Sequence, residues 1–118
     1  MASKPGPTGL RIRIVFGERG MIGPGKADLL QYIEETGSIA GAGRKLGMSY
    51  KRAWMLVETL NEMFAEPLVK SSRGGPKQGG AHLTETGARV LALYRKIEQS
   101  AGTRAKSGIA ELEGMLSR

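Results

Sequence analysis

The residues best suited to chemistry in this sequence are basic side chains that gather in its middle part. Between positions 37 and 83 the acidic residues are Glu58, Glu62 and Glu66. The basic residues of the same span are Arg44, Lys45, Lys51, Arg52, Lys70, Arg73 and Lys77. Guanidinium and ammonium groups bind phosphate oxygens, so this part of the chain is suited to a polyanionic ligand.

The overall charge points in the same direction. A formal net charge of +7 over 118 residues favours nucleic acid as the partner, with an anionic membrane second. No apolar run approaches the ~18 residues that a membrane span needs, so we expect no membrane partner. The first residues lack the apolar segment of a signal peptide and predict a flexible arm over 1–9. A cytoplasmic location is therefore expected.

Enzyme chemistry has few residues to draw on. The chain has no cysteine and a single histidine, His82. This excludes disulfides, thiolate zinc sites, cysteine nucleophiles and a multi-histidine metal site within one chain. His82 follows a glycine-rich stretch, and no nucleophile motif surrounds Ser49, Ser71 or Ser72. We predict that the protein is not an enzyme and uses no cofactor or metal, and that His82 lies near phosphates.

The N-terminal third predicts a strand and a helix. Apolar residues alternate with others over 10–16, which is typical of a half-buried strand. A glycine-rich loop is expected over 17–25. A first helix begins at about Pro24, and Gly37 is suited to end it. The apolar face of this helix comprises Ala27, Leu29, Leu30 and Ile33.

Two further helices are predicted, separated by a tight turn. Ser38 is suited to cap a short second helix, and Gly47 ends it where the turn needs a residue that tolerates positive φ. Ser49 is suited to cap a third helix that runs to about Phe64. The predicted buried stripe of this helix comprises Ala53, Leu56, Val57, Leu60, Met63 and Phe64.

A hairpin and a long helical region complete the chain. Strands are predicted over 68–70 and 81–83, and the tip between them carries Arg73 and Lys77 among double glycines. The final helical region opens at Thr84. Its apolar face comprises Val90, Tyr94, Ile97, Ala101, Ala105, Ile109, Leu112 and Leu116. Glycines at 102, 108 and 114 weaken this helix by ~1 kcal/mol each, so its last part is expected to need a partner surface.

The order of these elements predicts a winged helix-turn-helix, in which the third helix recognises DNA. That helix is basic at its start and acidic towards its end, which suits a helix that enters the major groove with its N-terminus first. We predict major-groove contacts from 49–64 and backbone contacts from the wing over 68–83. The residues predicted to bind DNA are Ser38, Arg44, Lys45, Ser49, Tyr50, Lys51, Arg52, Met55, Arg73, Lys77 and His82. For Tyr50 and for Trp54, packing at the edge of the core is the favoured alternative.

A specific pattern of residues runs through the helix-turn-helix and the hairpin. It consists of Ser49-Tyr-Lys-Arg-Ala-Trp54, double glycines at 74–75 and 79–80, and Ala81-His-Leu-Thr-Glu-Thr-Gly87. Over roughly residues 10–101 the chain resembles the N-terminal DNA-binding domain of the molybdate-responsive (ModE-type) regulators, which is related to the LysR-type winged helix-turn-helix. The resemblance implies promoter binding as a dimer, often at molybdenum-related genes. Full-length members carry C-terminal oxyanion-binding modules for which 118 residues leave no room, so we expect no molybdate binding by this chain.

The predicted fold class is mainly α with a small β component, a winged helix-turn-helix with a C-terminal dimerisation helix. The expected parts are the arm 1–9, the DNA-binding domain 10–88 and the helical dimerisation region 89–118. We expect a homodimer because the apolar face of the last region exceeds what one small domain covers, and because the edge of the strand 10–16 needs covering. The predicted function is a sequence-specific transcription regulator that binds double-stranded DNA.

Two other functions are weighed against this prediction. Residues 20–27 nearly match a phosphate-binding loop, which would make the chain a nucleotide-binding protein. Ala27 lacks the hydroxyl that binds Mg²⁺, and Pro24 removes one N–H from the phosphate cradle, so a loop leading into the first helix is favoured. A membrane-surface or protein-interaction role for the basic residues from Arg89 onward is disfavoured, because these charges are spread around the helix.

Overall fold

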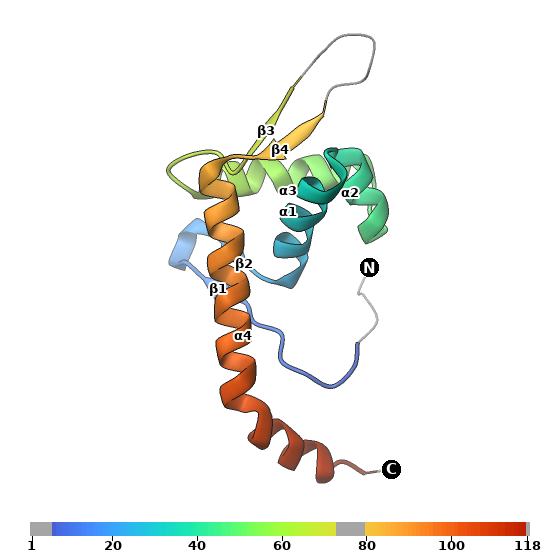
Figure 1. The fold of residues 1–118 in the computed structure, drawn as a ribbon, viewed down its shortest axis with the longest axis vertical. Coiled ribbons are helices and arrows are strands. Elements are labelled where there is room, and N and C mark those ends of the chain that lie inside the picture. The colour runs from blue at the N-terminus through green and yellow to red at the C-terminus, as the bar shows by residue number, and fades with distance from the viewer. Residues whose placement is uncertain (1–5, 73–79, 118) are drawn as a thin grey trace.

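A computed structural model describes residues 6–72 and 80–117. This part of the chain forms four α-helices and two small antiparallel sheets (Figure 1). The elements are, in order, β1 (Ile14–Val15), a 3₁₀ helix (Gly17–Arg19), β2 (Met21–Ile22), α1 (Pro24–Thr36), α2 (Ile39–Leu46), α3 (Tyr50–Met63), β3 (Val69–Ser71), β4 (Ala81–Leu83) and α4 (Glu85–Gly114). The prediction of a mainly helical fold with a small β component is confirmed.

The ends of the first three helices lie where capping residues were predicted. Gly37 ends α1 with φ 72°, and Gly47 ends α2 with φ 70°. Both are left-handed conformations that glycine adopts without steric cost. The Oγ atoms of Ser38 and Ser49 accept backbone N–H hydrogen bonds of 2.8 and 3.0 Å in the first turns of α2 and α3. Each satisfies an N–H group that has no partner within its helix.

The hydrophobic core lies where the three short helices meet the wing strands and the start of α4. The predicted apolar stripes of α1 and α3 face this core, as the helical period requires. Their buried residues are Ala27, Leu29, Leu30, Ile33, Ala53, Val57 and Leu60. Three further residues of the α3 stripe are half-buried at its edge: Leu56, Met63 and Phe64.

The strand predicted over 10–16 is wrong in extent, and the loop predicted over 17–25 contains a strand of its own. β1 is two residues long and pairs with β2, with Ile14 opposite Ile22. The next pair along the hairpin is joined by a 2.8 Å hydrogen bond from the Phe16 N–H to the Gly20 carbonyl oxygen, and the 3₁₀ helix between these two residues closes the hairpin. Before β1, the Ile12 carbonyl accepts a 2.6 Å hydrogen bond from the Tyr94 hydroxyl. The strand edge is thus partly covered within the chain.

The last helix, α4, is one continuous element of 30 residues, about 45 Å long at 1.5 Å per residue. The three glycines in its second half do not interrupt it, and the boundary expected between 88 and 89 lies in its first turn. Its buried residues are Gly87, Leu91 and Tyr94, all in its first third. The molecule therefore measures 57 × 30 × 25 Å.

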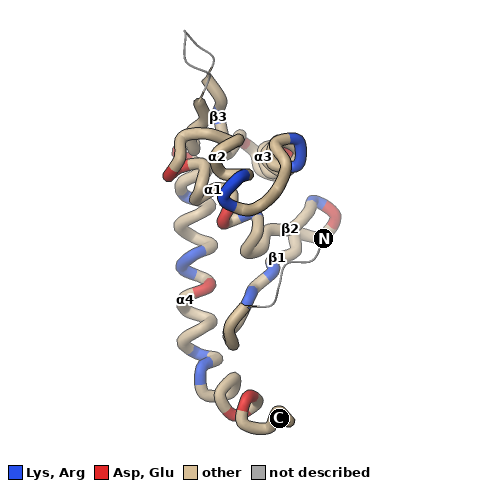
Figure 2. The backbone as a smooth tube through the Cα atoms, turned by 90° about the vertical axis from the view of Figure 1, so that its right-hand side faces the viewer, with Lys and Arg blue, Asp and Glu red and all other residues tan. Residues whose placement is uncertain are grey.

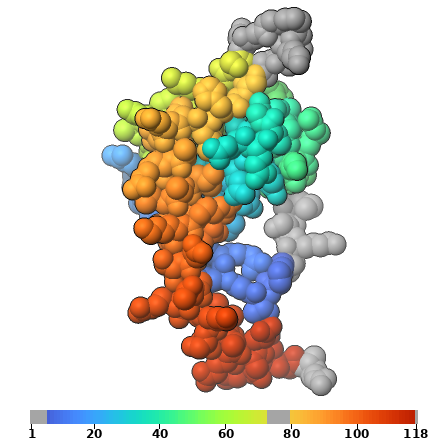
Figure 3. Space-filling view, in the orientation of Figure 1, coloured from blue at the N-terminus to red at the C-terminus, as the bar shows by residue number. Residues whose placement is uncertain are grey.

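Figure 3 shows the last turns of α4 standing apart from the helix-turn-helix body, with an N-terminal segment beside them. There the Thr8 hydroxyl donates a 2.6 Å hydrogen bond to the Glu113 carboxylate. None of the helices in the described residues is long and apolar enough to cross a membrane.

Candidate nucleic-acid interface

The start of α3 presents a group of exposed side chains to solvent. Lys51 and Arg52 are exposed, and so are Tyr50 and Met55, with 56% and 54% of their surface accessible. All four lie in the first two turns, next to the Ser49 cap. The N-terminus of a helix carries partial positive charge and free N–H groups, so these turns attract phosphate.

The turn between α2 and α3 brings a second basic pair to the same end of the molecule. Arg44 and Lys45 lie in the last turn of α2 and are exposed, and Figure 2 shows basic segments at the end of α2 and the start of α3. The helices approach closely at Gly43, where a Cβ would lie 3.3 Å from the Ala53 Cβ. A small residue at this crossing is what allows the tight turn.

Tyr50 and Trp54, which the sequence analysis grouped together, differ in their surroundings. The Tyr50 and Trp54 rings meet edge to face, with centroids 6.2 Å apart. Trp54 is half-buried against the core, whereas Tyr50 is exposed. The Lys45 ammonium lies 5.7 Å from the centroid of the Tyr32 ring. This cation–π contact holds the Lys45 side chain against α1.

The wing is a short antiparallel hairpin that projects from the end of the body opposite the C-terminus of α4 (Figure 1). Lys70 lies opposite His82, and both are exposed. The neighbouring pair, Val69 and Leu83, lies on the other face of the ladder and packs on the core. The hairpin therefore turns a basic residue and the histidine outward. Arg73 and Lys77, predicted at its tip, lie outside the described residues.

Ser38, which was also predicted to bind DNA, is half-buried, and its hydroxyl caps α2. Its position joins the wing to the helix-turn-helix. The neighbouring Gly37 carbonyl accepts a 2.9 Å hydrogen bond from the Ala81 N–H of β4. The wing is thereby attached to the junction of α1 and α2.

Asn61 attaches the wing to α3, and the sequence analysis missed it. Its Oδ1 accepts the N–H groups of Leu68 and Val69 at 2.8 and 3.1 Å, and its Nδ2 donates to the Val69 carbonyl at 3.2 Å. One amide thus satisfies three backbone groups where β3 begins. The available signal was an asparagine, a poor helix former, beside the buried Leu60 in the last turn of the helix.

The residues of the competing phosphate-loop pattern are arranged differently from a phosphate cradle. Met21 and Ile22 form β2 and pair with β1. The Lys26 ammonium, which would reach phosphate, donates a 2.9 Å hydrogen bond to the Met21 carbonyl. Burial lowers the pKa of Lys26. Among the described residues, no group of three or more His, Asp or Glu side chains could hold a metal ion.

The fold and this surface define a winged helix-turn-helix of the kind found in transcription regulators. The family model described as "Bacterial regulatory helix-turn-helix protein, lysR family" matches residues 27–88. The chain belongs to this family, whose members are regulatory rather than enzymatic.

Similar proteins narrow the assignment further. The molybdenum transport protein ModE of Azotobacter vinelandii is 42% identical over 89 residues, which are 73% of this chain and 33% of that protein. The molybdenum-pterin-binding protein MopA of Rhodobacter capsulatus is 43% identical over 77 residues, 65% of this chain and 29% of that one. The transcriptional regulator ModE of Yersinia pestis is 37% identical over 97 residues, 80% of this chain and 37% of that one.

The chain spans about a third of the length of these relatives. Among solved structures, the CbnR_DBD-DNA complex has the same fold, with a TM-score of 0.58, 21% identity, and coverage of 74% of this chain and 94% of that chain. The predicted resemblance is confirmed: this is a ModE-like helix-turn-helix domain of the LysR family.

Proposed function

We propose that the chain binds double-stranded DNA sequence-specifically as a transcription regulator, with α3 in the major groove and the β3–β4 wing on the sugar-phosphate backbone. The observation that carries the proposal is the exposed group at the capped start of α3: Tyr50, Lys51, Arg52 and Met55. These side chains lie outside the buried stripe of the same helix, so they are free to reach base edges. Exposed Arg44 and Lys70 extend the surface and suit phosphate contacts.

We further propose that two copies bind as a homodimer joined through α4. Exposed apolar residues lie on this helix and just beyond its end, with accessible fractions of 43% at Ile97 and 66% at Leu112 within the helix and 72% at Leu116 after it. Beside Ile97 lies an apolar hollow of about 270 Å³, lined by Ile14, Phe16, Ile22, Phe64, Val90, Leu93, Tyr94 and Ile97. Apolar surface of this extent favours burial against a second copy, and two copies would address two half-sites of an operator.

The target genes belong to the same proposal. Relatives with 37–42% identity are named a molybdenum transport protein and a transcriptional regulator, both ModE. We infer molybdenum-related promoters as the operators of this chain. Mapping of bound sites across the genome tests this inference, because recovered sites away from such genes contradict it.

Binding by α3 is tested with a double variant and a matched control. Lys51→Ala/Arg52→Ala removes one lysine and one arginine from the proposed interface. If these side chains read bases, the affinity falls by roughly 5- to 160-fold, as expected for about 1–3 kcal/mol. Arg89→Ala/Lys106→Ala removes the same charges from exposed positions of α4 and is expected to keep most of the affinity. Equal losses in both variants would refute the recognition role of α3.

The dimer is tested by analytical ultracentrifugation at tens of micromolar protein. Leu112→Asp changes a residue that is 66% exposed in the single chain, so it leaves the fold of one copy unaffected. We expect a dimeric mass for the wild type and a shift towards monomer for this variant. A monomeric wild type rejects this part of the proposal.

A further inference from the structure

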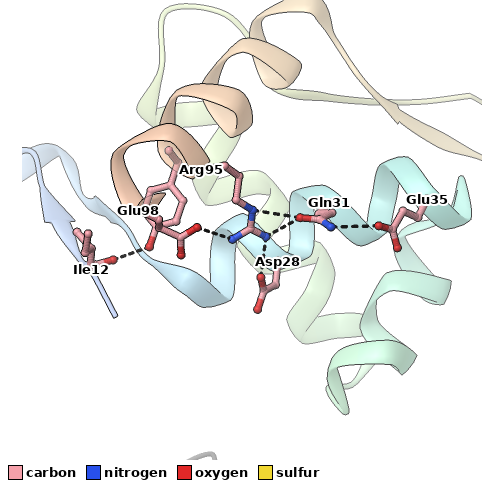
Figure 4. Close-up of polar contacts among 7 residues, drawn as sticks. Ile12, Asp28, Gln31, Glu35, Arg95 and Glu98 are labelled. Atoms are coloured by element: carbon pink, nitrogen blue, oxygen red, sulfur yellow. Dashed lines mark hydrogen bonds and ion pairs between the residues drawn. The ribbon is translucent and has the colours of Figure 1, made fainter. Parts of the chain in front are cut away.

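Arg95 joins α4 to α1 through a cluster of directional polar contacts (Figure 4). Its Nη2 lies 2.8 Å from Asp28 Oδ1 and 2.7 Å from Gln31 Oε1, and its Nε donates to the same Gln31 oxygen at 3.1 Å. Its Nη1 donates to Glu98 Oε1 at 3.0 Å. Gln31 in turn donates to Glu35 at 3.1 Å. Two residues of one α1 face, Asp28 and Gln31, thus hold the guanidinium together with Glu98 of α4, and Glu35 contacts only Gln31.

The guanidinium remains charged in this setting. Partial burial by itself lowers the pKa of Arg95, but the hydrogen bonds to Asp28 and Glu98 outweigh this and raise it. Arginine does not deprotonate in proteins, and its planar group binds several acceptors in a fixed orientation. A rotation of α4 relative to α1 would therefore break these hydrogen bonds. Apolar contacts resist such a rotation less, because they have no preferred direction.

Arg95 lies just after the buried part of α4, so its contacts affect the direction of the long part that follows. The buried residues of the helix, Gly87, Leu91 and Tyr94, all precede it. Beyond it the helix continues for about 28 Å at 1.5 Å per residue. A rotation of about 10° at Arg95 would move the far end by about 5 Å over that length.

We propose that Arg95 is a positioning residue that fixes the angle at which α4 leaves the helix-turn-helix and thereby sets the spacing of half-sites that the protein accepts. This inference rests on the proposed function, in which α4 joins two copies. With α4 held by a partner, its angle to α1 determines how far apart the two α3 helices lie. A dimer with a loose angle would accept several spacings.

The angle is measured in the protein itself, without DNA. Because the chain has no cysteine, spin labels attach only at introduced sites. Glu34→Cys on α1 and Ser107→Cys on α4 are both exposed and outside the cluster. Labelled chains are diluted with unlabelled chains so that double electron–electron resonance reports the distance within one chain.

We expect a narrow distance distribution with Arg95 present and a distribution that is clearly broadened or shifted in Arg95→Met. Arg95→Lys keeps the charge but loses the planar fork, and it should resemble Arg95→Met. Lys96→Met changes an exposed neighbour and should leave the distribution unchanged. Superimposable distributions for the wild type and Arg95→Met overturn the proposal.

Whether Arg95 sets the half-site spacing is measured by selecting bound duplexes from a randomised pool. The wild type should recover inverted half-sites at one spacing, and a change of one base pair should weaken binding on the order of 10-fold, comparable to loss of a base contact. Arg95→Met should recover several spacings while keeping its dimeric mass and its affinity for a single half-site. An unchanged spacing preference overturns the link. If the wild type binds no duplex, the proposed function and the link both fail, and the distance measurement still decides whether Arg95 sets the angle.

Discussion

Replacing Gly87 with alanine tests how closely α4 lies against the start of the wing. Gly87 is buried in the first turn of α4, and a Cβ there would lie closer to the Leu68 carbonyl oxygen than real Cβ contacts allow. The atoms in the way belong to the Leu68 backbone, which cannot rotate aside as a side chain can. The helix or the adjoining strand must therefore shift. The same oxygen accepts a 2.9 Å hydrogen bond from the Thr84 N–H, which such a shift would weaken.

The expected cost follows from these contacts. Adding a methyl group to a packed site costs about 1–3 kcal/mol, and loss of the hydrogen bond adds about 1 kcal/mol. Alanine in place of glycine in a helix returns about 1 kcal/mol. The three effects together predict that Gly87→Ala lowers the free energy of unfolding by about 1–3 kcal/mol.

Gly102→Ala is the matched control, because it makes the same exchange in the same helix. A Cβ at Gly102 would have no atom within 4 Å, so this variant should gain up to about 1 kcal/mol. Both variants are unfolded in urea and followed by far-ultraviolet circular dichroism. Protein concentrations must match, because in the proposed dimer association would add to the measured stability. A Gly87→Ala protein as stable as the wild type would refute the close packing.

Two further predictions concern single side chains. Asn61→Ala leaves the N–H groups of Leu68 and Val69 without their acceptor and should lower the free energy of unfolding by about 1–3 kcal/mol in the same experiment. Asn61→Asp keeps an acceptor oxygen and should lower it less. A larger loss in the aspartate variant would contradict the assigned contacts. Burial raises the pKa of Tyr94, and Glu98 adds to the rise, so in a Tyr32→Phe/Tyr50→Phe protein the phenolate absorbance should appear above pH 10. The pKa of Tyr94 is higher in the folded protein than in the unfolded chain. The stability that neutral Tyr94 contributes is therefore present below about pH 10 and is lost as the pH rises through the pKa of the folded protein. A titration midpoint at or below about pH 10 would contradict this.

The sequence by itself determined where the first three helices end and which faces of α1 and α3 are buried. Ser38 and Ser49 cap helices and Gly37 and Gly47 end them, because each of these effects depends on a residue and its neighbours within one turn. The stripes that face the core follow from the 3.6-residue period, and the wing strands follow from the residues on either side of the glycine-rich segment. The order of the elements was sufficient to predict the winged helix-turn-helix.

Only the tertiary structure decided which distant residues meet. The pairing of β1 with β2 was missed because two-residue strands leave no periodic signal, and Tyr94 bonds Ile12 across 82 positions. Asn61 and Arg95 gave no local sign of their partners, since a polar side chain on a helix can face solvent or a neighbouring backbone with the same sequence around it. Their roles arise when α3 meets β3 and when α4 crosses α1. Contacts of this kind depend on how the whole chain closes, and no short window of residues contains that information.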